Sequence, residues 1–166
     1  SNGVPVQIWQ DPNTPENIHA VYTFSAQETG WSDRTIQYFF SSDKGTTWSF
    51  VGNVPASGRA GFGTITGLST GVAMVVSHND GGGGGVRTQI AIDASPGLGS
   101  FNNLDPGGEA SKYIWPRIIA TSSISNTNKF VFVTSTSGAD SAFWNVGTSL
   151  TASNFLGYKP VPASPA

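Results

Sequence analysis

The sequence predicts an all-β fold made of repeated four-stranded units, and three observations support this prediction. The chain of 166 residues contains 21 glycines and 10 prolines, while only 11% of its residues are charged. This composition is typical of a β protein with many turns and excludes a charged disordered chain or a coiled coil. Short β-branched and aromatic stretches alternate with turn residues along the whole chain. Similar stretches return at a nearly constant interval, which indicates an internal repeat.

The repeat is clearest in three stretches rich in β-branched and aromatic residues. They lie at 18–25, 72–79 and 130–137. A shorter strand is predicted before each of them, at 6–9, 63–66 and 117–120. Another strand is predicted after each of them, at 35–41, 88–93 and 142–146. An aromatic residue then follows a turn in every unit, as Trp48, Phe101 and Phe155, with spacings of 53 and 54 residues.

A fourth strand completes each unit, although its signal fades along the chain. It is clear at 49–54, weaker near 101–104 and weakest near 156–161. Four-stranded antiparallel units at this period are typical of β-propeller blades. We therefore predict a single propeller segment with blades at 1–57, 58–110 and 111–166. A β-sandwich is the alternative, but it does not require an aromatic residue at constant spacing.

The turn after the strand at 35–41 has the most specific local sequence. Its pattern S-x-D-x-G-x-T-W is formed by Ser41, Asp43, Gly45, Thr47 and Trp48. The Asp43 carboxylate is expected to accept hydrogen bonds from the backbone of its own turn. Gly45 is expected to adopt a positive φ, and Trp48 to bury its ring between neighbouring sheets. All five positions resemble the Asp-box, or BNR repeat, of sialidase-like β-propellers.

The resemblance has consequences for the reading of the whole chain. In that family the Asp-box lies between the third and fourth strands, on the face away from the substrate, which implies a structural role for Asp43. The other two units keep only the aromatic residue, and the segment 115–120 resembles the innermost strand of the family. Sialidase propellers have six blades, so three units imply half of a ring. The chain would then be a fragment or subunit of a larger protein, or two copies would close the ring.

The candidate binding face lies at the other end of the predicted strands. It is formed by the loops at 26–34, 80–87 and 138–141 and by the connections at 57–61 and 108–113. Exposed aromatic rings can stack on sugar faces, while arginine and aspartate can bind sugar hydroxyls. The candidate ligand-binding residues are Trp31, Asp33, Arg34, Arg59, Arg87, Lys112, Tyr113 and Trp115. In the alternative interpretation, Trp115 caps the blade core and the charged residues only solvate the loops.

The sequence favours a non-catalytic role. A sialidase needs three arginines for the substrate carboxylate, a tyrosine nucleophile paired with a glutamate, and an aspartate as acid and base. The Arg-Ile-Pro motif of the family is missing from the first innermost strand, and Arg117 follows Pro116 in the wrong order. We therefore expect a module for glycan or protein recognition or assembly, with no catalytic residues assigned. The alternatives are part of a sialidase-type glycoside hydrolase whose remaining blades are absent, and a structural subunit of an extracellular assembly.

Other classes of site and location are predicted from simple patterns. His19 and His78 lack metal-ligand spacing and are expected to be ordinary strand residues, so no metal or cofactor is predicted. The glycine-rich run at 79–85 lacks the Lys-Ser/Thr of a P-loop and is expected to be a loop tip. Scattered basic residues argue against nucleic acid, and no apolar run is long enough for a membrane span. Few lysines and glutamates among many small polar residues favour a secreted or cell-surface protein. A glycan, a second copy or the remaining blades are the expected partners.

Overall fold

In the computed structural model, the described residues form three four-stranded antiparallel sheets. The structure describes residues 5–56, 58–81, 85–120, 129–136 and 141–162. Sheet 1 contains β1 (Ile8–Gln10), β2 (Ile18–Phe24), β3 (Thr35–Ser41) and β4 (Ser49–Val54). Sheet 2 contains β5 (Ala60–Gly67), β6 (Ala73–Asn79), β7 (Arg87–Asp93) and β8 (Phe101–Leu104). Sheet 3 contains β9 (Ile114–Ala120), β10 (Phe130–Ser135), β11 (Ala142–Gly147) and β12 (Lys159–Pro160).

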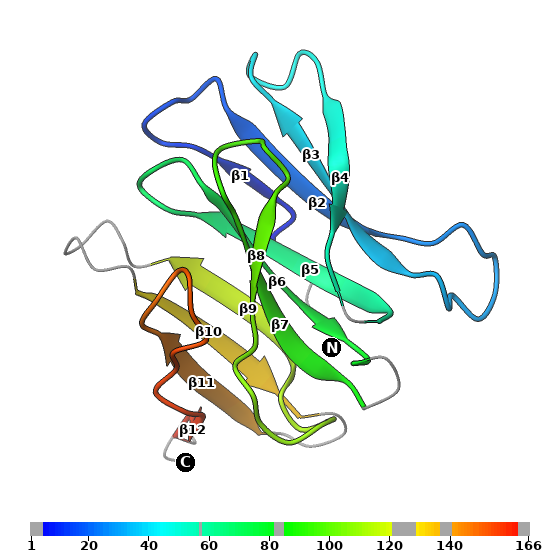
Figure 1. The fold of residues 1–166 in the computed structure, drawn as a ribbon, viewed down its shortest axis with the longest axis vertical. Helices are drawn as coiled ribbons and strands as arrows, with labels where there is room; N and C mark the ends of the chain where they lie inside the picture. The colour runs from blue at the N-terminus through cyan, green and yellow to red at the C-terminus, as the bar shows by residue number, and fades with distance from the viewer. Residues whose placement is uncertain (1–4, 57, 82–84, 121–128, 137–140, 163–166) are drawn as a thin grey trace.

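Each sheet is an antiparallel meander in which the strands follow one another in chain order. The three sheets succeed one another from the upper right to the lower left of Figure 1. This arrangement confirms the prediction of an all-β fold built from repeated four-stranded units. The number of blades in a complete ring and the blade boundaries stay predictions. The strand expected at 130–137 and the loop expected at 138–141 both include residues of the stretch 137–140. This stretch lies outside the described part of the chain.

The weakest predicted strand is also the shortest observed one. We expected it at 156–161, but β12 has two residues and is preceded by an isolated bridge between Gly147 and Phe155. Gly157 interrupts the stretch with a φ of +88°. Pro160 has no N–H group to donate to the ladder. Local chemistry therefore allows only a brief strand at this edge of sheet 3.

Sheet 2 lies between the other two sheets and is covered on both faces. On one side Val21, Ile36 and Tyr38 of sheet 1 pack with Ile65 and Val75. All residues of β6 are buried, as are all but the first of β7. On the other side, a second core joins sheet 2 to sheet 3 through the following residues: Met74, Val76, Ile90, Ile92, Leu104, Ile118, Phe130 and Phe132. Because successive side chains of a strand point to opposite faces of the sheet, each central strand of sheet 2 contributes to both cores.

The repeated aromatic residues have different environments in the three sheets. Phe101 packs on the first core and meets the Tyr38 ring edge-on at 5.3 Å. Phe155 packs on the second core. Trp48 is 42% exposed, and its indole Nε1 donates a hydrogen bond to the Gly45 carbonyl at 3.1 Å. The expectation that Trp48 is buried between sheets is wrong, because it immediately precedes β4 of an end sheet and its ring lies over its own turn.

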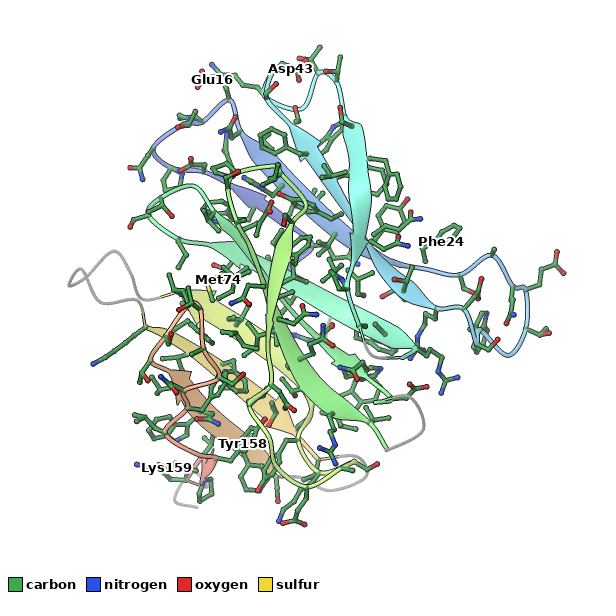
Figure 2. All side chains as sticks on the ribbon, viewed as in Figure 1. Glu16, Phe24, Asp43, Met74, Tyr158 and Lys159 are labelled. Carbon is green, nitrogen blue, oxygen red and sulfur yellow. The ribbon has the colours of Figure 1, made fainter. Side chains whose placement is uncertain are left out.

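The turn at 41–48 is held by its own side chains. The Thr47 amide donates to Asp43 Oδ1 at 2.8 Å, and the Thr47 hydroxyl donates to Asp43 Oδ2 at 2.6 Å. The Gly45 amide donates to the Ser41 hydroxyl at 2.8 Å, and Gly45 has a φ of +83°. Hydrogen bonds from Thr47, and then from Ser41, lower the pKa of Asp43 to about 2. Glu16 lies beside this turn, 3.2 Å from the Lys44 ammonium (Figure 2).

Gly67 provides a test of the seam between sheets 1 and 2. A Cβ atom at this position would lie 2.0 Å from the indole ring of Trp9, which packs on the first core. We expect Gly67→Ala to reduce the free energy of unfolding by roughly 1–3 kcal/mol, the usual cost of overpacking. Urea denaturation measures this loss. In a Trp9→Leu background the same substitution should cost clearly less, and an equal cost in both backgrounds would contradict the packing argument.

Candidate functional site

The connections from second to third strands and those between sheets lie at one end of the strands. This follows from the antiparallel meander in each sheet. Hydrogen bonds tie several of these connections together. Arg59 Nη1 donates to the Gly30 carbonyl at 3.4 Å, which joins the β4–β5 connection to the β2–β3 loop. The Thr88 hydroxyl donates to the Tyr113 carbonyl at 2.7 Å, which joins β7 to the β8–β9 connection.

The innermost strands β5 and β9 each carry an aromatic residue in an unusual backbone conformation. The register of β5 against β6 shifts between Gly61 and Thr64, and β9 has a similar irregularity against β10. Phe62 has a φ of +55° and Trp115 a φ of +57°. The two rings meet edge to face at 4.6 Å. Bulges and positive φ values at bulky residues are costly, and they gather where side chains are re-aimed toward a functional site.

His78 of β6 lies against these two rings and is 5% exposed. Its ring centroid is 5.0 Å from Phe62 and 5.0 Å from Trp115. Arg34 Nη2 lies 3.2 Å from His78 Nε2. A guanidinium can only donate, so Nε2 accepts this bond and the neutral ring carries its proton on Nδ1. The buried Nδ1–H has no hydrogen-bond partner among the residues that the structure describes.

Electrostatics keep this imidazole neutral. Burial lowers the pKa of His78 to about 4, and the charges of Arg34 and Arg59 lower it further, while Asp80 opposes them. At neutral pH the ring is therefore a hydrogen-bond donor without charge. It adds no repulsion to the neighbouring guanidinium groups.

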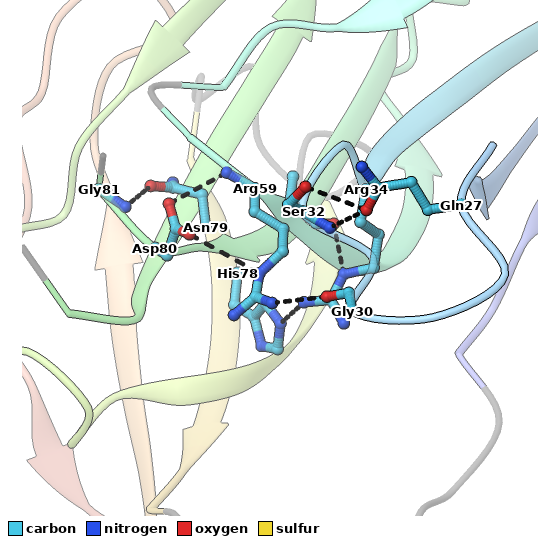
Figure 3. A network of polar contacts seen from close by, with 10 residues as sticks. Gln27, Gly30, Ser32, Arg34, Arg59, His78, Asn79, Asp80 and Gly81 are labelled. Atoms are coloured by element: carbon cyan, nitrogen blue, oxygen red, sulfur yellow. Dashed lines mark hydrogen bonds and ion pairs between the residues drawn. The ribbon is translucent and has the colours of Figure 1, made fainter. Parts of the chain in front are cut away.

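Two arginines border the imidazole, as Figure 3 shows. Arg34 Nε donates to the Ala60 carbonyl at 2.9 Å, and its guanidinium carbon lies 5.4 Å from the centre of the Phe62 ring. Arg59 Nε lies 3.7 Å from Asp80 Oδ2, and the Arg59 amide donates to Asp80 Oδ1 at 3.0 Å. Two guanidinium groups thus face a single paired carboxylate, so this cluster carries a net positive charge.

Trp31 stands at the rim of the cluster, in the loop between β2 and β3. It is 52% exposed and has a φ of +46°. Its carbonyl accepts a hydrogen bond from the Arg34 amide at 3.2 Å. A cavity of about 330 Å³ is lined here by Thr23, Phe24, Ser25, Gln27, Trp31 and Arg34. The loop therefore presents an aromatic ring and a guanidinium to the same cavity.

Asp33 is hydrogen-bonded within its own loop. Its carboxylate accepts hydrogen bonds from the Ser25 hydroxyl and, at 2.8 Å, from the Ala26 amide. The Ser25 hydrogen bond, with smaller backbone contributions, lowers the pKa of Asp33. Because these bonds lie within the β2–β3 loop, Asp33 holds the loop that carries Trp31.

The remaining candidate residues have other neighbours. Arg87 lines a separate cavity of about 510 Å³ together with Asn79, Gln89, Asp105 and Ser153. Lys112 pairs with Glu109 at 2.7 Å. The Tyr113 ring stacks on Tyr158 at 3.7 Å, with the rings nearly parallel. The structure thus brings Trp31, Arg34, Arg59 and Trp115 into one group and places Arg87, Lys112 and Tyr113 in other contacts.

Sequence reasoning missed two residues of the cluster. His78 was expected to be an ordinary strand residue, and Phe62 was not singled out. The available signal was the repeat itself, because Phe62 and Trp115 are 53 residues apart, as the other repeated aromatics are.

Residues 82–84 of the glycine-rich run lie outside the described residues. Within the described ranges, no group of three or more His, Cys, Asp or Glu residues could hold a metal ion. In the same ranges, no helix has the length and apolar character needed to cross a membrane.

Comparisons with known proteins give a fold and no family. No family model matches the chain, and no curated protein matches it. Among solved structures the chain is similar to Zg3597, a family 117 glycoside hydrolase from the marine bacterium Zobellia galactanivorans. The TM-score is 0.59 and the sequence identity is 14%. The match covers 96% of this chain and 55% of Zg3597. The chain has a β-propeller fold of the kind found in glycoside hydrolases.

Two fructofuranosidase structures from Schwanniomyces occidentalis are also similar. A variant complexed with fructosylnystose has a TM-score of 0.63, and the enzyme complexed with fructosyl-erythritol has one of 0.61. Both are 14% identical to this chain; they match 95% and 94% of it and 33% and 32% of their own length. The chain therefore spans between a third and about half of these proteins, and at this identity the likeness concerns the fold alone.

Proposed function

We propose that this chain is a propeller module that recognises a carbohydrate. Its site is formed by Arg34, Arg59, Phe62, His78 and Trp115, with Trp31 at the rim. The observation that carries the proposal is the buried His78 Nδ1–H, which lacks a partner among the described residues beside two aromatic rings. An unsatisfied buried donor costs about 1–3 kcal/mol. A ligand oxygen at this position would remove that cost.

The chemistry of the site matches an oxygen-rich ligand. The Phe62 and Trp115 rings can stack on the C–H faces of a sugar, and the His78 N–H and the two guanidinium groups can donate to its oxygens. Asp80 is the carboxylate of this cluster, and it is paired with Arg59. Donors therefore outnumber free acceptors, which favours sugars that present hydroxyl, carboxylate or sulfate oxygens.

The proposed role is recognition without catalysis. Most glycoside hydrolases act through two carboxyl groups that flank the scissile bond. On this face Asp33 holds the Trp31 loop, Asp80 pairs with Arg59, and Glu109 pairs with Lys112. These contacts are those of structural carboxylates. The proposal also includes a relationship to sialidase-like propellers, which the sequence of the 41–48 turn supports. It includes an extracellular location as well, which the composition of the chain favours.

A second candidate function is supported by the comparisons. The similar structures are glycoside hydrolases, and this chain spans only 32–55% of their length. In this interpretation the chain forms part of a glycoside hydrolase whose other blades complete the active centre. The two functions differ in a simple assay. A recognition module binds glycans without hydrolysing them, whereas a larger polypeptide that includes this chain would cleave glycosides at this face.

Glycan binding can be tested at Trp31, with Trp48 as a matched control. Both indoles are about half exposed, but Trp48 lies at the opposite end of sheet 1. After an array screen identifies a bound glycan, Trp31→Ala is expected to weaken its Kd roughly tenfold, the effect of losing one aromatic contact. Trp48→Ala should leave Kd unchanged in calorimetry. Equal losses in both variants would contradict the site, and an array without hits would favour a structural subunit.

A further inference from the structure

A second cavity lies apart from the cluster around His78. It is bounded by β6, β7 and β8 of sheet 2 and by the connection between β11 and β12 of sheet 3. Its volume of about 510 Å³ is in the range of small-molecule sites. Leu104 is the one aliphatic residue of its described lining, and polar side chains provide most of the rest. The cavity therefore suits a ligand that forms many hydrogen bonds.

The cavity exists because β8 is shorter than the strand with which it pairs. Leu104 is the last residue of β8 and pairs with Ile90, so that Arg87, Thr88 and Gln89 of β7 extend beyond it. In sheet 1, by contrast, β4 is paired to within one residue of the start of β3. Pro106 follows Leu104 closely and has no N–H group to continue the ladder. The first residues of β7 therefore border a cavity instead of a fourth strand.

Two buried amide side chains line the inner part of this cavity. Asn79 is 5% exposed and Gln89 is 8% exposed. Asn79 Nδ2 donates to Gln89 Oε1 at 2.7 Å, and Asn79 Oδ1 accepts a hydrogen bond from the Gly81 amide at 2.8 Å (Figure 3). Gln89 Nε2 donates to the Pro55 carbonyl. These bonds hold both amides in place, and the Gln89 amide group has a second N–H to donate.

Arg87 and Asp105 give the lining one charge of each sign. No hydrogen bond or ion pair joins the Arg87 guanidinium to another described residue. Asp105 Oδ1 accepts a hydrogen bond from the Gly107 amide at 2.8 Å, which leaves Oδ2 as a further acceptor. The Ser153 hydroxyl accepts from the Asp105 amide at 3.0 Å and keeps its own proton to donate. The lining thus offers donors and acceptors while its two charges cancel.

A buried hydroxyl group lies beside this cavity. Tyr158 Oη is buried and forms no hydrogen bond within the described part of the chain. Burial raises the pKa of Tyr158, the neighbouring Thr88 hydroxyl opposes this shift, and the charge of Asp105 adds to it. Because Thr88 and Asp105 both line the cavity, the phenol is near its wall. Buried polar groups are rarely without a partner, and one at a cavity wall is a place where a bound oxygen gains a hydrogen bond.

We propose that this cavity binds a neutral sugar residue. A sugar hydroxyl both donates and accepts, so a ring with several hydroxyls can use Arg87, Asp105 and Ser153 at the same time. An anion would be repelled by the Asp105 carboxylate and a cation by the Arg87 guanidinium, which favours a ligand without charge. The cavity shares no residue with the site around His78, where two guanidinium groups face one paired carboxylate. The inference is therefore independent of the function proposed above.

Matched sugars test the binding and its preference for a neutral ring. Glucose and galactose are compared with their uronate and ammonium forms, and ligand-observed NMR with the 166-residue chain measures each Kd. At least one neutral sugar should bind more tightly than both of its charged forms. Arg87→Ala should weaken its Kd roughly tenfold, the effect of losing a hydrogen bond from a charged group. Arg117→Ala is the control, because Arg117 is also half-buried but lies in β9 outside the cavity; its Kd should be unchanged.

A change of charge at position 105 tests the role of the paired signs. Asp105→Asn keeps an oxygen for the Gly107 amide but leaves Arg87 as the single charge of the lining, so the uronate should now bind more tightly than the neutral sugar. Glu16→Gln, at an exposed carboxylate beside the 41–48 turn, should keep the original order. Far-UV circular dichroism checks that each variant is folded. The proposal is overturned if neither neutral sugar binds or if the parent chain prefers a charged form. Binding that Arg87→Ala leaves unchanged would also overturn it, since the sugar would then lie elsewhere, as in the cluster around His78.

Discussion

Acidification from about pH 7 to about pH 4 is expected to destabilise the protein by several kcal/mol, because two buried histidines are neutral in the folded state. His19 is fully buried and His78 nearly so. Burial lowers the pKa of His19 to about 4, although Asp93 and Asp11 oppose the shift. Burial, followed by Arg34 and Arg59, lowers the pKa of His78 to about 4. Both rings therefore resist protonation far below their ordinary pKa of 6.5.

The direction of the effect follows from proton binding. Between the unfolded pKa of 6.5 and the folded pKa of about 4, the unfolded chain binds more protons than the folded one. The contribution of the two histidines to the free energy of unfolding is therefore fully present above pH 6.5. It falls as the pH drops toward 4, and these groups cause no further loss below that value. Each histidine contributes on the order of 3 kcal/mol to the loss. The pKa of Asp43, about 2, places its own contribution in a lower pH window.

Urea denaturation at about pH 7.5 and about pH 4.5 measures the loss, and two variants assign it. His19→Gln and His78→Gln keep a polar side chain of similar size but cannot titrate. Each variant is expected to lose roughly half of the difference in unfolding free energy between the two pH values. Their stabilities at the higher pH serve as the reference. If the full difference persisted in both variants, the buried histidines would not be its source.

The strands were predictable because their signal is local. Alternating β-branched and aromatic residues specify a strand wherever it lies, and the twelve strands of the described residues fall at or near the predicted stretches. Trp48 was mispredicted for a non-local reason, since the equivalent Phe101 and Phe155 pack on the core that their sheet shares with the preceding one, and no sheet precedes sheet 1 among the described residues. His78 and Phe62 were missed as members of the cluster for the same reason. The rings of Phe62 and Trp115 come from different sheets, and only the packed fold brings them together.

The residue that organises the β7–β8 turn of sheet 2 could not be predicted from the turn pattern. The segment at 95–101 has lost the residues of the 41–48 pattern, so only its aromatic residue was expected to matter. In the structure the last residue of β7, Asp93, organises this turn from the strand side. Its carboxylate accepts hydrogen bonds from the amides of Ala94, Gly99 and Ser100. Ser41, the last residue of β3, also accepts a hydrogen bond from its own turn, so the strand-final position is used in both sheets.

Replacing Asp93 by alanine is expected to reduce the free energy of unfolding by roughly 3 kcal/mol. The substitution leaves the Gly99 and Ser100 amides without their acceptor, while the Ala94 amide keeps its hydrogen bond to the Ser100 carbonyl at 2.9 Å. It also removes the acceptor of the Tyr38 hydroxyl, which donates to Asp93 Oδ2 at 3.3 Å and accepts from the His19 ring at 2.7 Å. Because Asp93 is 2% exposed, water can replace these bonds only in part. Calorimetry should show a decrease in Tm on the order of 10 °C.

Asp93→Asn separates the hydrogen bonds of Asp93 from its charge, and Asp105→Ala serves as a control. Asp93→Asn keeps one oxygen acceptor and should lose about half as much stability as Asp93→Ala. Asp105→Ala also removes a carboxylate that binds an amide of its own loop, that of Gly107 at 2.8 Å, but this residue is exposed and the effect should be small. Comparable losses at positions 93 and 105 would mean that burial and the three-amide contact do not decide the stability of the turn. A large loss confined to Asp93 would show that a strand-final acidic residue, invisible to the turn pattern, holds this turn.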